Sequence, residues 1–104
     1  MFMYGFSIDV PMPMAMYEQV IKDLKAAGKA SPRERLLHLC APTDQGFRIT
    51  EIWESHEAVD RYGDEAMRPA VAKVAGEEAA AGGPPPNQEF EVQGLQLRGD
   101  WVTA

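Results

Sequence analysis

The stretch from residue 46 to residue 62 places the tightest constraint on the fold of this chain. It reads Gly-Phe-Arg-Ile-Thr-Glu-Ile-Trp-Glu-Ser-His-Glu-Ala-Val-Asp-Arg-Tyr. Apolar and polar residues alternate up to Trp53, which is the period of a strand with one buried face. Ser55 can then cap a helix with its hydroxyl, and Glu57 places negative charge near the positive helix end. A strand that leads directly into a capped helix indicates an α+β unit.

Length, composition and charge fit one domain with a modest hydrophobic core. The chain has 104 residues, of which 45% are hydrophobic and 25% charged, as in ordinary globular proteins. Its formal net charge is −6 and its basic residues are scattered. This argues against a nucleic-acid partner, because phosphate binding needs clustered Lys and Arg. We expect a single domain over residues 1–97, followed by a C-terminal tail over residues 98–104.

The cysteine content and the N-terminal residues bear on the cellular compartment. Cys40 is the only cysteine, so an intrachain disulfide is excluded and a reducing compartment is favoured. The N-terminal residues lack the basic segment of a signal peptide, and the longest apolar runs are far shorter than a membrane span. We therefore expect a cytoplasmic protein with no membrane partner.

Four strands and two helical regions follow from the spacing of apolar residues. The strands are expected over residues 2–10, 35–41, 47–53 and 89–97, and the helical regions over residues 14–27 and 56–74. Tyr17 belongs to the apolar stripe of the first helical region, which we expect to pack as core. The second region is expected to be interrupted at Gly63-Asp64 and to kink or restart at Pro69. Residues 79–87 are expected to form a surface loop, and whether Gly82–Pro86 covers a cavity stays open.

The order β-α-β-β-α-β is the split arrangement of ferredoxin-like folds. The expected class is α+β, with a four-stranded antiparallel sheet and helices on one face. The first strand carries Phe2, Tyr4, Phe6 and Ile8 and still needs a side toward the helices. Both sheet faces are therefore expected to be partly apolar. We predict a homodimer in which two sheets close against each other and enclose a pocket between them.

His38 and Glu51 are the candidate catalytic residues. Turn residues 42–46 join the second and third strands into a hairpin. A turn centred between residues 44 and 45 places His38 opposite Glu51, and Leu36 opposite Trp53, unless a bulge shifts the register. Directly opposed residues lie on the same side of a sheet. We expect this arrangement to present the His38 imidazole to the pocket between the two sheets.

The roles of these two residues stay open between chemistry and packing. An imidazole titrates near neutral pH, so His38 could accept a phenolic or enolic proton. A buried histidine with one hydrogen bond explains His38 equally well. The Glu51 carboxylate is costly on an apolar face unless it is hydrated or paired. It is expected to be solvated, to pair with Arg35 or Arg48, or to orient His38.

Tyr4, Phe6, Ile49 and Trp53 are the candidate substrate-binding residues. The Trp53 ring could stack on an aromatic ligand and donate its indole N–H, and Tyr4 adds a hydroxyl. Ordinary core packing is the alternative for these side chains. The chain has no phosphate-binding loop, Cys-pair metal motif or nucleophile elbow. We therefore expect no cofactor and no metal.

The order of elements and residues 38 to 62 resemble the antibiotic biosynthesis monooxygenase-like family. The residues that carry the resemblance are the run from Gly46 to Ser55, with Trp53-Glu54-Ser55 before an acidic helix, and His38 eight residues before Gly46. The resemblance implies a dimeric α+β barrel. It also implies a cofactor-independent monooxygenase that acts on an aromatic or polyketide-like secondary metabolite, with His38 as general base.

Two other functions fit the same residues. One is a non-catalytic dimer that binds a small hydrophobic ligand or supports an enzyme of the same pathway. The other is a non-redox cyclase or isomerase that uses the same acid–base pair without oxygen.

Overall fold

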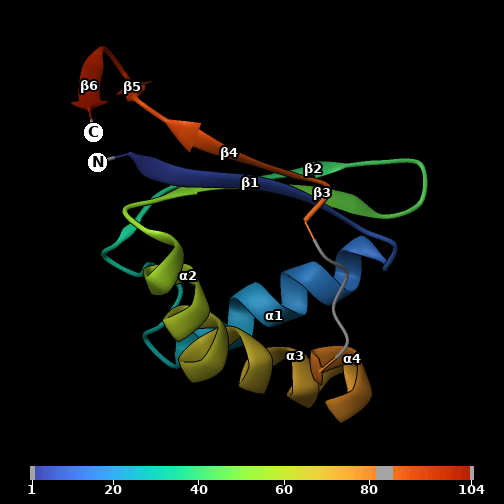
Figure 1. Cartoon of the computed structure of the whole chain (residues 1–104). Helices are drawn as coiled ribbons and strands as arrows, with labels where there is room; N and C mark the ends of the chain where they lie inside the picture. Colours follow the sequence, from blue (N-terminus) through green and yellow to red (C-terminus); the bar gives the residue numbers. More distant parts are fainter. Residues whose placement is uncertain (1, 82–85, 104) are drawn as a thin grey trace.

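The computed structural model describes residues 2–81 and 86–103. A four-stranded antiparallel sheet carries a layer of helices on one face (Figure 1). Its strands lie in the spatial order β2-β3-β1-β4. Their bounds are β1 (Met3–Val10), β2 (Arg35–Pro42), β3 (Phe47–Trp53) and β4 (Gln88–Val92). The α+β class and the antiparallel sheet predicted from the sequence are confirmed.

Helix α1 (Met14–Ala26) follows β1 after the short Pro-Met-Pro connection. It ends at Ala26, and Gly28 just beyond it has a φ of 74°, in the left-handed region that glycine adopts without strain. The N–H of Lys29 then donates to the carbonyl of Leu24. The chain therefore leaves α1 in a closed turn and runs back toward the sheet to begin β2.

The second helical region changes its winding and is interrupted at Gly76, whose φ of 95° is not helical. It comprises α2 (His56–Tyr62), the π-helical segment η1 (Gly63–Met67), α3 (Arg68–Ala75) and the short α4 (Glu77–Ala81). The Ser55 hydroxyl accepts the N–H of Ala58 at 3.2 Å, so the predicted helix cap is confirmed. The interruption predicted at Gly63 is this π segment rather than a break. Its wider turn precedes Pro69, which lacks an N–H and crowds the preceding turn of an α-helix.

The helices pack on each other through small side chains. Val20 and Leu24 of α1 are buried against Ala66 of η1 and Ala70 of α3. Because alanine has no side chain beyond Cβ, the helices approach closely along this line. The partly buried side chains around this cluster are Ile21, Ala30, Tyr62, Met67, Val71 and Val74.

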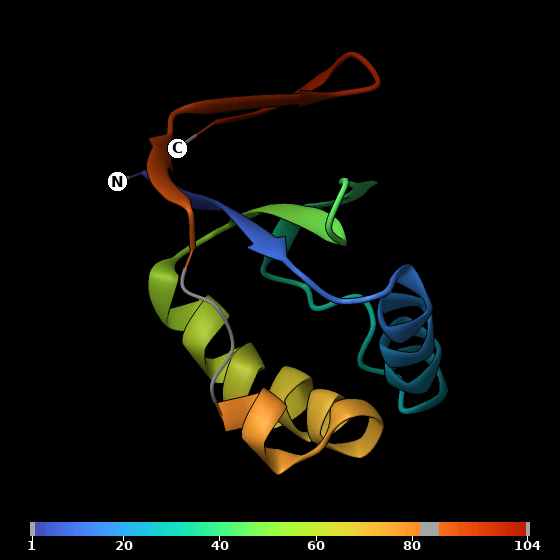
Figure 2. The same cartoon turned by 90° about the vertical axis from the view of Figure 1, so that its right-hand side faces the viewer.

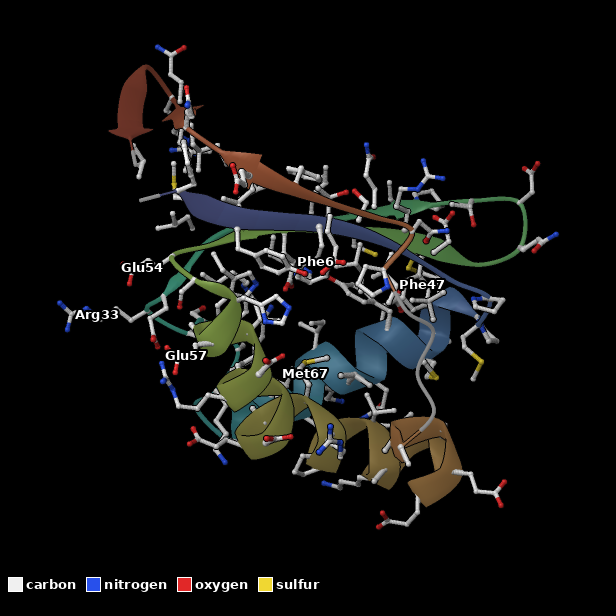
Figure 3. The ribbon with its side chains drawn as sticks, viewed as in Figure 1. Phe6, Arg33, Phe47, Glu54, Glu57 and Met67 are labelled. Atoms are coloured by element: carbon white, nitrogen blue, oxygen red, sulfur yellow. The ribbon has the colours of Figure 1, made fainter. Side chains whose placement is uncertain are left out.

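The aromatic face of β1 is turned toward the helices. Tyr4 pairs with Trp53 and Phe6 pairs with Glu51 across β1 and β3, so these four side chains share one side of the sheet. The Trp53 ring lies 5.4 Å from that of Tyr62 in α2. Figure 3 shows Phe6 between the sheet and the helices. The expectation that the aromatic side chains of β1 lie on the face away from the helices is therefore wrong.

The opposite face of the sheet, which we call the outer face, carries the alternate residues of the same strands. Gly5 is buried there beneath the ring of Phe90, its partner on β4. The hydroxyls of Ser7 and Thr50 lie 2.8 Å apart. Leu39 is 53% exposed. The outer face is thus partly apolar, as predicted, but through a different set of residues.

The C-terminal residues form a hairpin that lies on the side of the sheet away from the helices (Figures 1 and 2). The predicted strand 89–97 divides into β4 and β5 (Gly94–Leu97), and β5 pairs with β6 (Asp100–Thr103) in a separate two-stranded sheet. Arg98 and Gly99 both have positive φ, as a tight two-residue hairpin turn requires. Residues 98–103, predicted as a tail, are therefore this turn and the second strand.

Two further expectations concern the loop and the membrane. Residues 82–85 of the predicted loop lie outside the described residues, and residues 79–81, which were also expected to be loop, form the end of α4 instead. Across the parts of the chain that the structure describes, no helix combines the length and the apolar character needed to cross a membrane.

Candidate active site

The β2–β3 hairpin brings His38 opposite Glu51, as the turn chemistry predicted. Leu36 is not opposite Trp53, because the register shifts between Arg35 and Leu37. Arg35 takes the position opposite Trp53 instead. This irregularity turns the guanidinium of Arg35 to the helix-facing side, where His38 and Glu51 also lie.

His38 and Glu51 form a close hydrogen bond across the hairpin. The distance from His38 Nδ1 to Glu51 Oε2 is 2.5 Å. Because an ionised carboxylate only accepts, Nδ1 carries the proton and donates it. The side chains are 21% exposed for His38 and 11% exposed for Glu51. The contact expected from the register is therefore present in a largely dry environment.

Two further donors hold the Glu51 carboxylate. The indole N–H of Trp53 donates to Oε1 at 2.8 Å, and Nη1 of Arg35 lies 3.4 Å from Oε2. The alternative pairing with Arg35 thus occurs together with the His38 contact, whereas Arg48 bonds to Asp9 on the outer face. A carboxylate that would be costly in this layer is stabilised by three donors.

Arg35 is itself held from both sides. Its Nη2 donates to the carbonyl of Ala30 at 2.7 Å. Its guanidinium carbon lies 5.9 Å from the ring centroid of Trp53 and 5.8 Å from that of Tyr62, within the range of a cation–π interaction. The positive charge next to Glu51 therefore has a defined position.

Tyr17 of α1 completes the site, and sequence reasoning missed it. Its hydroxyl lies 2.6 Å from Nε2 of His38, and the two rings are parallel within 3°. Since Nδ1 carries the imidazole proton, Nε2 accepts and Tyr17 donates. Burial raises the pKa of the Tyr17 hydroxyl, and the neighbouring Cys40 thiol adds to this effect. One sequence feature could have identified Tyr17. It carries a hydroxyl within the apolar stripe of its helix, and a buried tyrosine hydroxyl needs a hydrogen-bond partner.

The candidate substrate-binding residues divide into two groups. Trp53 is 1% exposed, so its ring faces protein atoms and its N–H is used by Glu51. Tyr4, Phe6 and Ile49 lie on the same side of the sheet and are only partly buried. The Tyr4 hydroxyl donates to Glu89 at 2.5 Å. Burial and this hydrogen bond raise the pKa of Tyr4.

His38 lies under the helix layer. Its partner Tyr17 belongs to α1, and Phe47 of the same sheet face lies 5.4 Å from the Tyr17 ring. The prediction that His38 faces a pocket between two sheets is therefore wrong. The candidate active site lies between the sheet and the helices of one chain, because the side of the sheet that carries Glu51 and Trp53 is the side that α1 and α2 cover.

The described residues include no group of three or more His, Cys, Asp or Glu side chains arranged to hold a metal ion. Comparison of the chain with protein-family models, with curated proteins and with solved structures found no match. The resemblance of residues 38 to 62 to the antibiotic biosynthesis monooxygenase-like family therefore stays a prediction.

Proposed function

We propose that this chain is a small enzyme that removes a proton from a phenolic or enolic substrate, with His38 as the general base. The observation that carries the proposal is the 2.5 Å hydrogen bond from His38 Nδ1 to Glu51. It selects the tautomer whose Nε2 accepts a proton, and it places a negative charge beside the imidazolium that then forms. A positioned base of this kind contributes about 10²–10⁴-fold to a rate.

Glu51, Trp53 and Arg35 act as positioning residues in this proposal. The Trp53 and Arg35 contacts hold both carboxylate oxygens of Glu51, so the carboxylate does not have to reorganise when His38 becomes charged. Preorganised charge in a layer with little water is worth more than the same charge in bulk solvent. Support comes from the burial of Glu51 and from the number of its partners.

The reaction class we propose is cofactor-independent oxygenation of an aromatic or polyketide-like metabolite. A deprotonated, electron-rich aromatic can pass electrons to O₂, and the balance closes without another reductant: a ring CH₂ and O₂ give C=O and H₂O. Support comes from the resemblance of residues 38 to 62. The strand order β2-β3-β1-β4 supports the ferredoxin-like arrangement that this resemblance implies.

Anthrone oxidation under air tests the proposal. Wild-type protein is expected to form the quinone faster than buffer does, and His38→Ala is expected to slow the reaction by about 10²–10⁴-fold. Glu51→Gln should also be slower, because the carboxylate charge is lost. His56→Ala is the matched control, since His56 is the other histidine and is exposed on α2. Equal rates for wild type and His38→Ala would remove His38 from the mechanism.

A non-catalytic ligand-binding dimer is the second candidate. The observation that favours it is that both ring nitrogens of His38 already have partners within the chain, as in a histidine with a purely structural role. Native mass spectrometry with aromatic ligands separates the two candidates, because a non-catalytic binding protein would retain a ligand without consuming it. Product formation that is equally fast without oxygen would instead indicate a cyclase or isomerase.

We also propose a cytoplasmic homodimer that pairs through the outer face of the sheet. Leu39 is 53% exposed there, and a twofold axis would bury it against its own copy. The compartment rests on the lone free Cys40. Sedimentation velocity is expected to give a dimer for wild type and a monomer for Leu39→Lys. A wild-type monomer at high concentration would contradict this assembly.

A further inference from the structure

We propose that Tyr17 is the residue that contacts the substrate, and that it passes the substrate proton inward to His38. This inference rests on the proposed function and keeps its phenolic or enolic substrate; it adds the residue that meets the substrate hydroxyl. It makes Tyr17 a catalytic residue and His38 the group on which the proton comes to rest.

The first argument is that the accepting nitrogen of His38 is already occupied. The Tyr17 hydroxyl lies 2.6 Å from Nε2, and Nδ1 is used by Glu51 at 2.5 Å. A proton from outside therefore reaches the imidazole either through the Tyr17 oxygen or after Tyr17 has moved away. The parallel rings and the contact with Phe47 hold the hydroxyl in place, which favours transfer through it.

The second argument is the direction in which the chain of groups runs. Glu51 and His38 project from β3 and β2, whereas Tyr17 projects from α1 on the other side of the layer. Side-chain exposure rises from 11% at Glu51 to 21% at His38, and Tyr17 is only partly buried. The row thus leads from a buried, fully partnered carboxylate on β3, through His38 on β2, to a partly buried phenol on α1.

The third argument concerns the charges around the phenol. Burial raises the pKa of Tyr17, Cys40 and Glu51 raise it further, and Arg35 opposes them. Tyr17 is therefore a neutral donor at rest. It becomes an efficient carrier only if its own proton leaves toward His38 as another arrives, and the hydrogen bond to Nε2 provides that route.

The step balances as two coupled proton transfers. The substrate O–H gives its proton to the Tyr17 oxygen while the Tyr17 proton moves to Nε2 of His38. The products are a substrate oxyanion and an imidazolium paired with Glu51, and Tyr17 ends as the neutral phenol it was. The step involves no oxidation or reduction.

The test uses p-nitrophenol, whose phenol and phenolate forms have distinct visible spectra. The probe is added to wild type, Tyr17→Phe, His38→Gln and Tyr62→Phe at a pH below the pKa of free p-nitrophenol. Calorimetry gives the amount bound and absorbance gives its ionised fraction. Tyr62→Phe is the matched control, because the Tyr62 hydroxyl donates to the carbonyl of Lys29 outside the row.

The expected result is that wild type and Tyr62→Phe ionise the bound probe. Tyr17→Phe and His38→Gln should each lower the ratio of bound phenolate to bound phenol by about tenfold, which is one pKa unit. If Tyr17→Phe ionises the probe as well as wild type while His38→Gln does not, His38 contacts the substrate directly. The inference then fails and the proposed function stands. If wild type ionises no probe, both fail.

A second measurement needs no variant. In wild-type protein with ¹⁵N-labelled histidine, the Nε2 resonance of His38 should move from the accepting toward the protonated position when p-nitrophenol is added. An unchanged resonance at saturating probe would overturn the inference.

Discussion

The two faces of the four-stranded sheet treat their polar groups in opposite ways. On the face under the helices, the Glu51 carboxylate is held by His38, Trp53 and Arg35. On the outer face, Arg48 bonds to Asp9 at 2.6 Å, with side chains 55% and 40% exposed. Both are ion pairs carried by neighbouring strands. The comparison shows that helix cover, rather than the pairing of strands, decides how exposed a charged pair is to solvent, and we expect the covered pair to contribute more to stability.

Some apolar groups show the same contrast, although Met3 and Ile52 of the outer face are buried. Trp53 is 1% exposed beneath the helices, whereas Leu39 is 53% exposed on the outer face. The outer face has the hairpin of β5 and β6 on its side but no helices (Figure 2). Its stability should therefore depend on close packing within the sheet, as at Gly5 and Phe90, and its charges should matter little.

Removing the buried carboxylate should have the largest effect. Glu51→Ala leaves the charge of Arg35 and the N–H groups of His38 and Trp53 without their acceptor. We expect the free energy of unfolding to fall by about 3–5 kcal/mol, the usual cost of breaking a buried pair. Urea denaturation measures this, with Asp9→Ala as the outer-face control that should change the midpoint little. Similar losses for both variants would end the contrast between the faces.

A methyl group at Gly5 should have the next largest effect. A Cβ there would lie 2.2 Å from Cε2 of Phe90, so Gly5→Ala should lower the free energy of unfolding by about 1–3 kcal/mol. Gly63→Ala is the matched control. Its Cβ would have no atom within 4 Å, its φ is −55°, and it should gain about 0.4–1 kcal/mol. An unchanged midpoint for Gly5→Ala would show that the ring moves freely.

The smallest expected effect is on the pH dependence of stability, which should differ between the two faces. Burial raises the pKa of Tyr4, Tyr17 and Tyr62, which all lie between the sheet and the helices, above 10.0. The folded state keeps these groups neutral where the unfolded chain ionises. The contribution of these tyrosines to stability should therefore be constant below about pH 10 and fall as the pH rises through their folded pKa values.

On the outer face, the hydrogen bond from Arg48 lowers the pKa of Asp9 below 3.8. Its small contribution is present above that pH and should be lost as the pH falls through the lowered value. Denaturation midpoints measured across the pH range test the predicted losses of stability at high and at low pH. The ultraviolet absorbance of tyrosinate follows the ionisation of the tyrosines. Tyrosines that all titrate at 10 would contradict the burial described here.

The local features of the chain were predictable because neighbours in sequence determine them. The Ser55 cap needs only a hydroxyl near the free N–H groups of a helix start. The His38–Glu51 pair needs only the position of a short turn, since opposed residues in a hairpin follow by counting. By contrast, the bulge that moves Arg35 opposite Trp53 has no signal in the residues around it.

The hairpin of β5 and β6 shows a second kind of miss. The alternation of apolar and polar residues continues through Gly94, so the sequence predicts one strand over residues 89–97. The Arg98-Gly99 turn that joins β5 to β6 is only a weak sequence signal for a hairpin. Tyr17 shows a third kind. Helical spacing places it on the inner side of α1, but its partner His38 lies 21 residues away in the chain.

The sequence by itself determined the first three strands, the two helical regions, the β2–β3 hairpin and the position of an imidazole opposite a carboxylate, because spacing and turn chemistry act over a few residues. Only the tertiary structure decided which side of the sheet the helices cover. Alternation defines two faces without saying which is inner, and that choice depends on how the crossing helices pack. It placed His38 beside Tyr17 under α1 rather than in a space between two sheets.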